Sequence, residues 1–342
     1  MTRRPTSDSF TIRDVAKKAG VSVATVSRYI NRNTPVSPKV ARRLEKVMAE
    51  LKYVPHAAAR NLASRKTRVI GLLLTNIDND FFAPLLSGVE QIVRKEGYNL
   101  LVATYHSDNR DSVLPAIGSH NTDGLLVFAD SLPDDELTKL YEAGFPMVLI
   151  HRTPPASLPI PSVTVENKSA TYRLVEHLIV QHNKRRILFL RGPMHQEDSY
   201  WRETGYRSAL EAHGIPFDEN LMLVGEFEHE IAYKAMKKFL EDEKHAEFDA
   251  VFAGDDNAAI GVINALTEHG HRVPENIPVV GFDDLRLSAF LTPPLTTVRA
   301  PTNTVGRVSA ERLFGLLKNE TSDGITLLPT EIIIRRSCGC NS

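Results

Sequence analysis

The sequence predicts an all-α head at the N-terminus, followed by a larger α/β body built from two doubly wound parallel sheets. Three observations lead to this prediction. Residues 11–63 have the apolar spacing of short helices. Beyond Arg68, short runs rich in Leu, Val and Ile alternate with amphipathic stretches. The charge divides at the same place, because residues 1–68 hold 16 Lys and Arg against 4 Asp and Glu. The head therefore carries +12 and the rest of the chain −13.

The head begins after a polar lead, residues 1–9, which we expect to be disordered. In TIRDVAKKAGVSVATVSRYINRN (11–33), Val15 and Ala19 lie on the apolar face of a first helix, and Gly20 suits the left-handed residue that ends it. Ser22 can cap a second helix, and Ser37 can cap a third over residues 38–51. Helix, tight turn, helix is the arrangement that lays its second helix in the major groove of DNA.

The body consists of apolar runs separated by stretches with helical spacing. The runs are 69–74, 100–104, 124–128, 147–150, 186–190, 250–254 and 278–282. The helical stretches between them include 84–96, 169–181, 202–213, 230–241 and 257–269. About 270 residues exceed what one such sheet needs, so we expect two α/β subdomains.

Two long segments of the chain closely resemble the LacI/GalR family of transcriptional regulators. They are DVAKKAGVSVATVSRYIN (14–31) and VSPKVARRLEKVMAELKYVPHAAARNLASRKTRVIGLLL (36–74). The likeness continues through NDFFAPLLSGVE (79–90), GDDNAAIG (254–261), VVGFDD (279–284) and PPLTTVRAP (293–301). The resemblance implies a helix-turn-helix headpiece, a periplasmic-binding-protein-like sensor, and a homodimer that binds a palindromic operator.

The domain boundaries follow from these patterns together. We expect a helix-turn-helix domain over 10–54, a hinge helix or linker over 55–67, and an effector-binding and dimerisation domain over 68–338. Within the last, subdomain 1 covers about 68–164 and 292–325, and subdomain 2 about 165–291 and 326–338.

The expected DNA contacts lie on the second helix and at the ends of the head. Val23, Ala24, Thr25 and Arg28 would face base edges and phosphates, and Arg28 can form two hydrogen bonds with a guanine. The full set is Thr11, Ser22, Val23, Ala24, Thr25, Ser27, Arg28, Asn31, Ser37, Tyr53, His56, Ala59, Leu62 and Ala63.

The hinge segment PHAAARNLASRK (55–66) is too short to be a stable helix alone, so we expect it to order on DNA. By resemblance, Leu62 would insert into a minor-groove step and kink the duplex. Alternatively, Leu62 packs on the partner subunit.

Candidate effector contacts follow the apolar runs, because ligands of doubly wound sheets bind beyond the carboxyl ends of the strands. Polar groups from separate strand ends, with aromatic rings nearby, suit a polyhydroxylated ligand such as a sugar or glycoside. The candidates are Asn76, Asn79, Phe81, Phe82, His151, Arg152, Tyr200, Arg202, Phe227, Asp255 and Asp283.

The resemblance sharpens some of these assignments. It makes Arg202 the residue that clamps the effector, Asp283 the acidic residue opposite it, and Phe227 and Asp255 further pocket positions. Many family members have Asn-Asp where this chain has Asp255-Asp256. The extra acceptor fits a hydroxyl-rich or cationic ligand and disfavours an anionic one unless Arg152 or Arg202 compensates. Asp256 and Asp284 read better as structural carboxylates. The roles of His151 and Arg152 stay open.

Other functional classes fit the sequence less well. It has no Gly-rich phosphate loop, HExxH or GxSxG, so we expect no enzyme and no cofactor. Cys338 and Cys340 supply only two ligands, so we expect plain thiols and no metal. A solute-binding protein is disfavoured by the basic head and by the lack of an apolar leader, and we expect a cytoplasmic protein that does not contact a membrane.

The expected mechanism is allosteric. An effector that closes the cleft between the subdomains would change the spacing of the two hinge segments in the dimer. Repression relieved by a sugar is the preferred interpretation, and a corepressor or activator role stays open.

Overall fold

We describe a computed structural model that covers residues 10–31, 36–53, 66–77, 79–105, 117–155, 158–321 and 324–341. The lead 1–9 and the predicted hinge contacts His56, Ala59, Leu62 and Ala63 lie outside these residues. The chain forms two compact units, Met1–Arg68 and Val69–Ser342, which we treat separately.

The first unit is a three-helix head made of α1 (Ile12–Ala19), α2 (Val23–Asn31) and α3 (Pro38–Glu50). Gly20 ends α1 at φ 60°, the left-handed conformation that the sequence predicts. Val15, Val26 and Leu44, one from each helix, are fully buried in a common core. The periodicity of the helices therefore corresponds to one small core.

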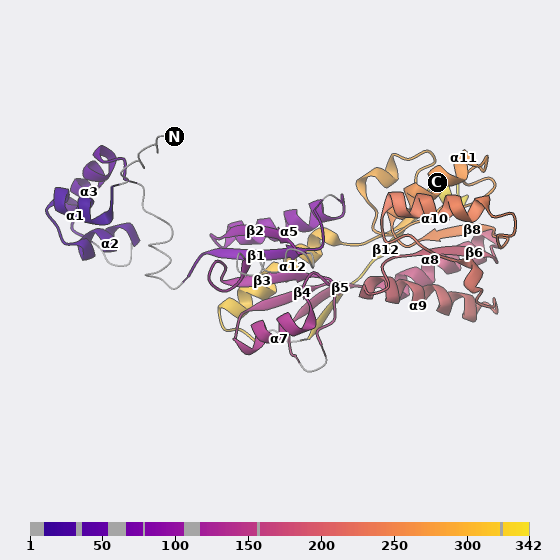
Figure 1. Ribbon diagram of the computed structural model, residues 1–342, viewed down its shortest axis with the longest axis horizontal. Helices are drawn as coiled ribbons and strands as arrows, with labels where there is room; N and C mark the ends of the chain where they lie inside the picture. The colour runs from indigo at the N-terminus through magenta and orange to yellow at the C-terminus, as the bar shows by residue number, and fades with distance from the viewer. Residues whose placement is uncertain are drawn as a thin grey trace, which may run out of the picture. The chain divides into compact units, whose positions relative to one another are not determined.

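The first lobe of the second unit contains a parallel six-stranded sheet in the order β11-β5-β4-β3-β1-β2 (Figure 1). Side chains alternate across it. Leu72 and Leu74 pack in the core beneath α5 and α12, whereas Leu73 packs on the opposite face with Leu137 of α7. The strands are β1 (Val69–Leu74), β2 (Asn99–Thr104), β3 (Gly124–Phe128), β4 (Met147–Ile150), β5 (Ser162–Val165) and β11 (Ile325–Leu328), and the helices are α5 (Phe82–Lys95), α7 (Asp134–Glu142) and α12 (Thr302–Leu317).

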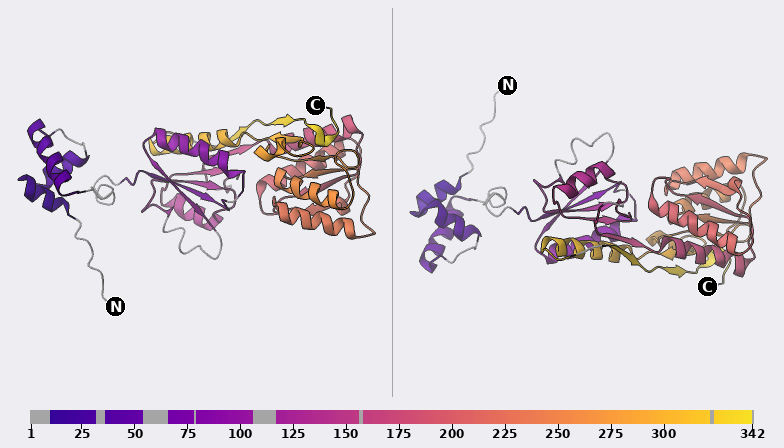
Figure 2. Two further views of the ribbon diagram at one scale, coloured as in Figure 1. Left: turned by 90° about the horizontal axis from the view of Figure 1, so that it is seen from above. Right: turned by 90° about the horizontal axis from the view of Figure 1, so that it is seen from below.

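The second lobe contains a parallel four-stranded sheet in the order β7-β6-β8-β9, also covered by helices on both faces (Figure 2). Phe189 packs in the core beneath α8 and α9, and its neighbours Leu188 and Leu190 pack beneath α10 and α11. The elements are α8 (Asn167–His182), β6 (Ile187–Arg191), α9 (Glu197–Ala212), β7 (Met222–Val224), α10 (His229–Glu241), β8 (Ala250–Ala253), α11 (Asp256–Glu268) and β9 (Val279–Val280), with short 3-10 helices η1 (Glu219–Leu221), η2 (Arg286–Ala289) and η3 (Arg336–Cys338).

The chain crosses between the lobes after β5, between β10 (Thr297–Arg299) and α12, and between β11 and β12 (Glu331–Ile333). Strands β10 and β12 pair antiparallel. The sequence prediction placed 292–325 in the first lobe, but Leu295 and Val298 are fully buried in cores of the second lobe. Apolar periodicity did not reveal this boundary because β10 is only three residues long.

The strands and helices that the apolar runs predict are all present, with ends shifted by a few residues. Within the described part of the chain, no helix combines the length and hydrophobicity that crossing a lipid bilayer requires.

Candidate functional site

Helix α2 of the head presents polar and small side chains outward and an apolar side chain inward. Ser22 Oγ accepts a hydrogen bond from the backbone N–H of Thr25 at 3.1 Å, so it caps the helix as predicted. Val26 is fully buried, while Val23, with 42% of its surface exposed, and Arg28 are open to solvent. The residues proposed to read DNA are therefore accessible.

Other predicted DNA contacts lie at the edges of the head. Thr11 caps α1 reciprocally with Asp14, whose pKa the Thr11 backbone and hydroxyl lower. Ser37 precedes α3 as predicted, but its side chain forms no capping hydrogen bond. Tyr53 is half-buried and packs against the head core. Asn31 is the last residue of α2, and its side chain is outside the described part.

Polar contacts with α3 hold the other two helices of the head, α1 and α2, in place. Tyr29 donates its hydroxyl to Glu45 at 2.8 Å, and Lys18 of α1 pairs with Glu50 at 3.0 Å. Both acidic partners are on α3. Glu45 and Glu50 thus hold the helices of the head together.

A cleft lies between the two lobes of the second unit, which we call the interlobe cleft, and its cavity volume is about 80 Å³. The first lobe contributes Thr75, Asn76, Asn79, Phe81, Phe82 and Phe128, and the second contributes Gln196, Asp198, Arg202, Glu226, Phe227, Glu228, Asp255 and Asp283.

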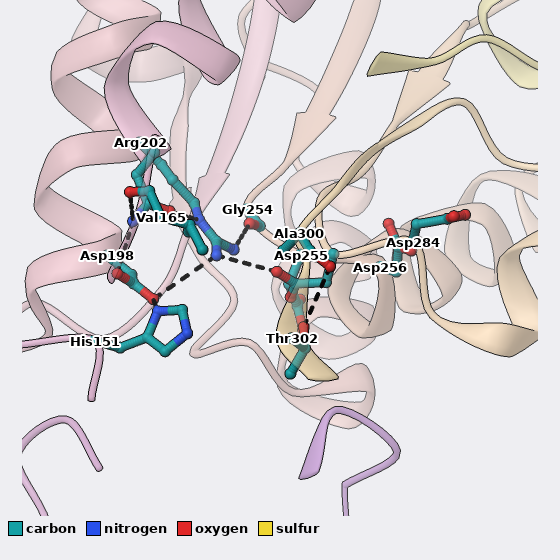
Figure 3. Close-up of polar contacts among 12 residues, drawn as sticks. His151, Val165, Asp198, Arg202, Gly254, Asp255, Asp256, Asp284, Ala300 and Thr302 are labelled. Atoms are coloured by element: carbon teal, nitrogen blue, oxygen red, sulfur yellow. Dashed lines mark hydrogen bonds and ion pairs between the residues drawn. The ribbon is translucent and has the colours of Figure 1, made fainter. Parts of the chain in front are cut away.

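Arg202 of α9 is the central cation of this cleft, and it is 2% exposed. Its Nε donates to Asn167 Oδ1 at 2.9 Å, and its Nη1 donates to the carbonyl oxygen of Gly254 at 2.6 Å (Figure 3). Its Nη2 pairs with Asp283 Oδ1 at 3.1 Å, and the guanidinium lies 3.7 Å from the ring centroid of Phe282. These contacts fix the guanidinium in one orientation before any ligand binds.

Two buried carboxylates accompany Arg202 at the ends of β8 and β9. Asp255 caps α11 by accepting the backbone N–H of Ala258 at 2.8 Å. Burial, together with the nearby charge of Asp283, raises the pKa of Asp255 to about 7. Burial also raises the pKa of Asp283, although the Arg202 charge opposes this. Near neutral pH, Asp255 can therefore either donate or accept a hydrogen bond.

Asp256 and Asp284 are structural, as the sequence favours. Asp256 is fully buried and accepts hydrogen bonds from the hydroxyls of Ser288 at 2.5 Å and Thr297 at 2.6 Å. Its pKa is raised well above the usual value by burial. Asp284 pairs with Arg299 at 2.7 Å and with Arg335 at 2.6 Å.

His151, which follows β4, links the first lobe to the second. Its Nδ1 lies 2.7 Å from Asp198 Oδ2 at the start of α9, and both side chains are largely buried (Figure 3). Asp198 also accepts from Asn167 Nδ2 at 2.7 Å. Burial raises the pKa of Asp198, but His151, Arg202 and Asn167 outweigh it, so the net shift is downward. The contact between His151 and Asp198 therefore joins the two lobes, although His151 itself is not among the residues that line the interlobe cleft.

Aromatic rings cover the apolar part of the cleft. Phe81 contacts Phe128 with ring centroids 5.8 Å apart. On the other lobe, Phe227 has φ 59° and lies 5.1 Å from the Arg202 guanidinium. Gly192 makes room for it, since a Cβ there would be 2.1 Å from the Phe227 ring.

Besides His151, two other predicted effector contacts are absent from the cleft lining. Arg152 donates to the carbonyl oxygens of Ala129 and Leu132 and pairs with Asp134, so it points away from the interlobe cleft. Tyr200 is 57% exposed and is absent from the cleft lining. Both residues were selected by position along the chain, which does not specify side-chain direction.

The first-lobe asparagines have different environments. Asn79 Oδ1 accepts the backbone N–H of Phe81 at 2.9 Å and so shapes the turn before α5. Asn76 Oδ1 is buried beside the cleft, without a hydrogen-bond partner among the described residues. A buried acceptor of this kind needs a partner, and a ligand hydroxyl would supply one.

Sequence reasoning missed several lining residues, including Thr75, Gln196, Glu226 and Glu228. It also missed Asp198, which lies four residues before Arg202. Helix spacing places residues i and i+4 on one face, and that signal could have identified Asp198.

Two family models match the chain. Residues 11–56 match the model of bacterial regulatory proteins, lacI family, and residues 175–338 match that of a periplasmic binding protein-like domain.

Curated relatives match over nearly their whole length. The catabolite control protein A of Priestia megaterium is 32% identical over 332 residues, covering 96% of this chain and 98% of the relative. The ribose operon repressor of Escherichia coli K12 is 31% identical over 330 residues, covering 95% and 98%. The HTH-type transcriptional repressor PurR of Vibrio atlanticus is 33% identical over 315 residues, covering 91% and 92%.

Solved structures also match the whole chain. The Lac repressor dimer bound to operator and the anti-inducer ONPF has a TM-score of 0.84 at 26% identity, covering 97% of this chain and 99% of that one. The transcriptional regulator CelR–cellobiose complex has a TM-score of 0.73 at 30% identity, covering 96% and 99%.

Proposed function

This chain belongs to the lacI family of bacterial regulatory proteins, and we propose that it represses carbohydrate-utilisation genes under the control of a sugar-like effector bound in the interlobe cleft. The function of a sequence-specific transcriptional regulator, not an enzyme, follows from the family. The effector class, its site and the regulated genes are the proposal. We infer action in the cytoplasm, where operator DNA is found.

The observation that carries the effector class is the donor and acceptor set of the cleft. Arg202 is a fixed donor, Asp255 and Asp283 are carboxyl groups, and Asn76 has an acceptor that needs a partner. Vicinal hydroxyls can satisfy such groups in pairs, while a ring such as Phe227 covers the apolar face of a sugar. Asp283 already pairs with Arg202 at 3.1 Å, which disfavours an anionic ligand.

Regulation follows from the position of the cleft. A ligand that contacts Asn76 and Arg202 together touches both lobes and stabilises one arrangement of them. Linkage then requires effector and operator to change each other's affinity by the same factor. We propose release of the operator by the effector, acting on a dimer on a palindromic site, and we note that the related Lac repressor is a dimer on its operator.

We further propose domains of 10–54 for DNA reading, 55–67 for the hinge, and 68–338 for effector binding and dimerisation. In the hinge, Leu62→Ser should abolish operator binding and leave ligand-induced thermal stabilisation unchanged. Unchanged operator affinity would contradict the wedge role and favour packing of Leu62 on the partner.

The test of the effector class uses the full-length protein in a thermal-shift screen of pentoses, hexoses, disaccharides, nucleosides and purine bases. Operator binding is then measured, with and without each stabilising compound, on a palindrome selected from random duplexes. We expect a neutral sugar to raise the melting temperature and to weaken operator binding at least tenfold. Asp283→Asn should lose this response, while Glu219→Gln, an exposed control on η1, should retain it.

Stabilisation by purine bases alone would overturn the sugar class but not the regulatory function. Failure of the protein to prefer any duplex over random competitor would contradict DNA reading by the head.

A further inference from the structure

Four potential metal ligands lie close together in the second lobe, and none of them lines the interlobe cleft. They are His177 and His182 near the end of α8, Cys338 in η3, and Cys340 in the tail after it. One ligand atom from each residue lies within 4.8 Å of the corresponding atoms of all the others. Cys340 Sγ is 3.4 Å from His182 Nε2 and 3.7 Å from His177 Nε2.

The fold builds this cluster from separate segments. The C-terminal segment after β12 lies on the second lobe (Figures 1 and 2). It is held there by Ser337, whose hydroxyl donates to the Val279 carbonyl oxygen at 2.6 Å and accepts the backbone N–H of Thr296 at 2.8 Å. Gly339 has φ 102°, which lets the chain turn so that both cysteines face α8.

We propose that His177, His182, Cys338 and Cys340 together bind one Zn²⁺ ion in a structural site of the Cys₂His₂ type. Two thiolates and two imidazoles in a tetrahedron are the usual donor set of structural zinc. With Zn–N of about 2.0 Å and Zn–S of about 2.3 Å, ligand atoms of such a tetrahedron lie about 3.3 to 3.8 Å apart. The two Cys340–histidine distances are already within that range, and the widest separation must close by about 1 Å.

Burial is consistent with a closed structural site. Cys338 is fully buried, and the other three residues are half-buried. Burial lowers the pKa of both histidines, which favours the neutral imidazole that ligates metal. Burial also raises the pKa of Cys340 to about 11, so zinc binding must displace the thiol protons.

This proposal revises the sequence expectation of two plain thiols and no metal. The cysteines offered only two ligands, and the histidines that complete the set lie about 160 residues earlier. The alternative to zinc binding is a disulfide between Cys338 and Cys340, which would leave neither sulfur free to bind a metal.

Zinc binding would attach the C-terminal tail firmly to the second lobe. The ion would fix the tail to α8, just beyond the point where β12 has crossed from the other lobe. Zinc would therefore stabilise the second-lobe end of one interlobe connection.

The experiment measures zinc in the full-length protein, purified in reducing buffer, by elemental mass spectrometry. Metal is then removed by a chelator and replaced by Co²⁺, whose visible absorption reports a tetrahedral thiolate site. Cys340→Ser and His182→Gln are chosen because both positions are partly exposed and should tolerate the change. His269→Gln is the control, an exposed histidine whose Nδ1 lies 2.8 Å from the Ala265 carbonyl oxygen.

We expect about one equivalent of zinc per chain, retained by the control and lost from both variants. The cobalt spectrum should follow the same pattern. Chelation should lower the melting temperature of the wild type and control by about 5 to 10 °C, and leave those of the variants unchanged. Substoichiometric zinc with no cobalt signal, or a disulfide that persists in reducing buffer, would overturn the proposal.

Discussion

Replacing Arg202 by methionine should leave Asp283 buried beside a hydrocarbon chain in place of its cation. The two charges are 3.1 Å apart, and both side chains are more than nine-tenths buried. At an effective dielectric constant of about 20, their attraction is about 5 kcal/mol. Breaking a buried pair from one side costs about 3 to 5 kcal/mol, so we expect a loss of that order in the free energy of unfolding.

The loss should depend on the second partner and on pH. In the double variant Arg202→Met/Asp283→Asn, neither charge of this pair is present. Most of the lost free energy of unfolding should therefore be recovered. Burial already raises the pKa of Asp283, and loss of Arg202 should raise it further. The single variant should then take up a proton as pH falls, and its gap from the wild type should narrow.

The assay is urea unfolding followed by tryptophan fluorescence. Trp201, the single tryptophan of the chain, lies on α9 and reports the second unit alone. Arg207→Met is the control on the same helix, since Arg207 is about half exposed and pairs with Glu203 at 2.7 Å. That pair should contribute no more than about 1 kcal/mol. Equal effects of the two single variants, or no recovery in the double variant, would refute the role of Arg202 as a buried counter-ion.

Three further predictions concern the carboxyl groups, the aromatic wall and the head. Burial beside Asp283 raises the pKa of Asp255 from 3.8 to about 7, so the fold favours its protonated form. The wild type should lose up to about 4 kcal/mol of unfolding free energy as pH rises from 4 to 7, and Asp255→Asn should flatten that slope in urea titrations. Gly192→Ala should displace the Phe227 ring, since the new Cβ would lie 2.1 Å from it, and should weaken effector binding at least tenfold by calorimetry; unchanged affinity would exclude that ring from the site. Ser22→Ala should cost the head about 1 kcal/mol by removing the α2 cap, and should lower operator affinity several-fold in fluorescence anisotropy, whereas Ser22→Thr should restore it.

The sequence predicted strands better than side-chain directions. Runs such as 69–74 and 250–253 are buried on both faces of parallel sheets, and continuous apolar runs are typical of such strands. The strand-end rule then located Asp255 and Asp283 correctly in the interlobe cleft. It failed for Arg152, because the carbonyl oxygens of Ala129 and Leu132 and the carboxylate of Asp134 hold its guanidinium outside the cleft lining.

Residues on α9 show a second limit. Successive helix residues point about 100° apart, so Asp198 and Arg202 share the cleft face while Tyr200 projects to solvent. The cluster of His177, His182, Cys338 and Cys340 shows a third limit of prediction from sequence. These residues come together only because the C-terminal tail packs on α8, which no local sequence pattern encodes.

The connection of the head to the first lobe has a consequence for how different ligands would change operator binding. The head is joined in sequence to β1, which belongs to the first lobe, so along the chain the second lobe is connected to the head through the first. A compound held by Arg202 and Asp283 alone would bind tightly yet be silent, because it favours no arrangement of the lobes. Efficacy would come from atoms that also reach Asn76 or Phe81. Under the proposed mechanism, affinity and efficacy are separable, and we expect that a silent ligand can compete with the effector.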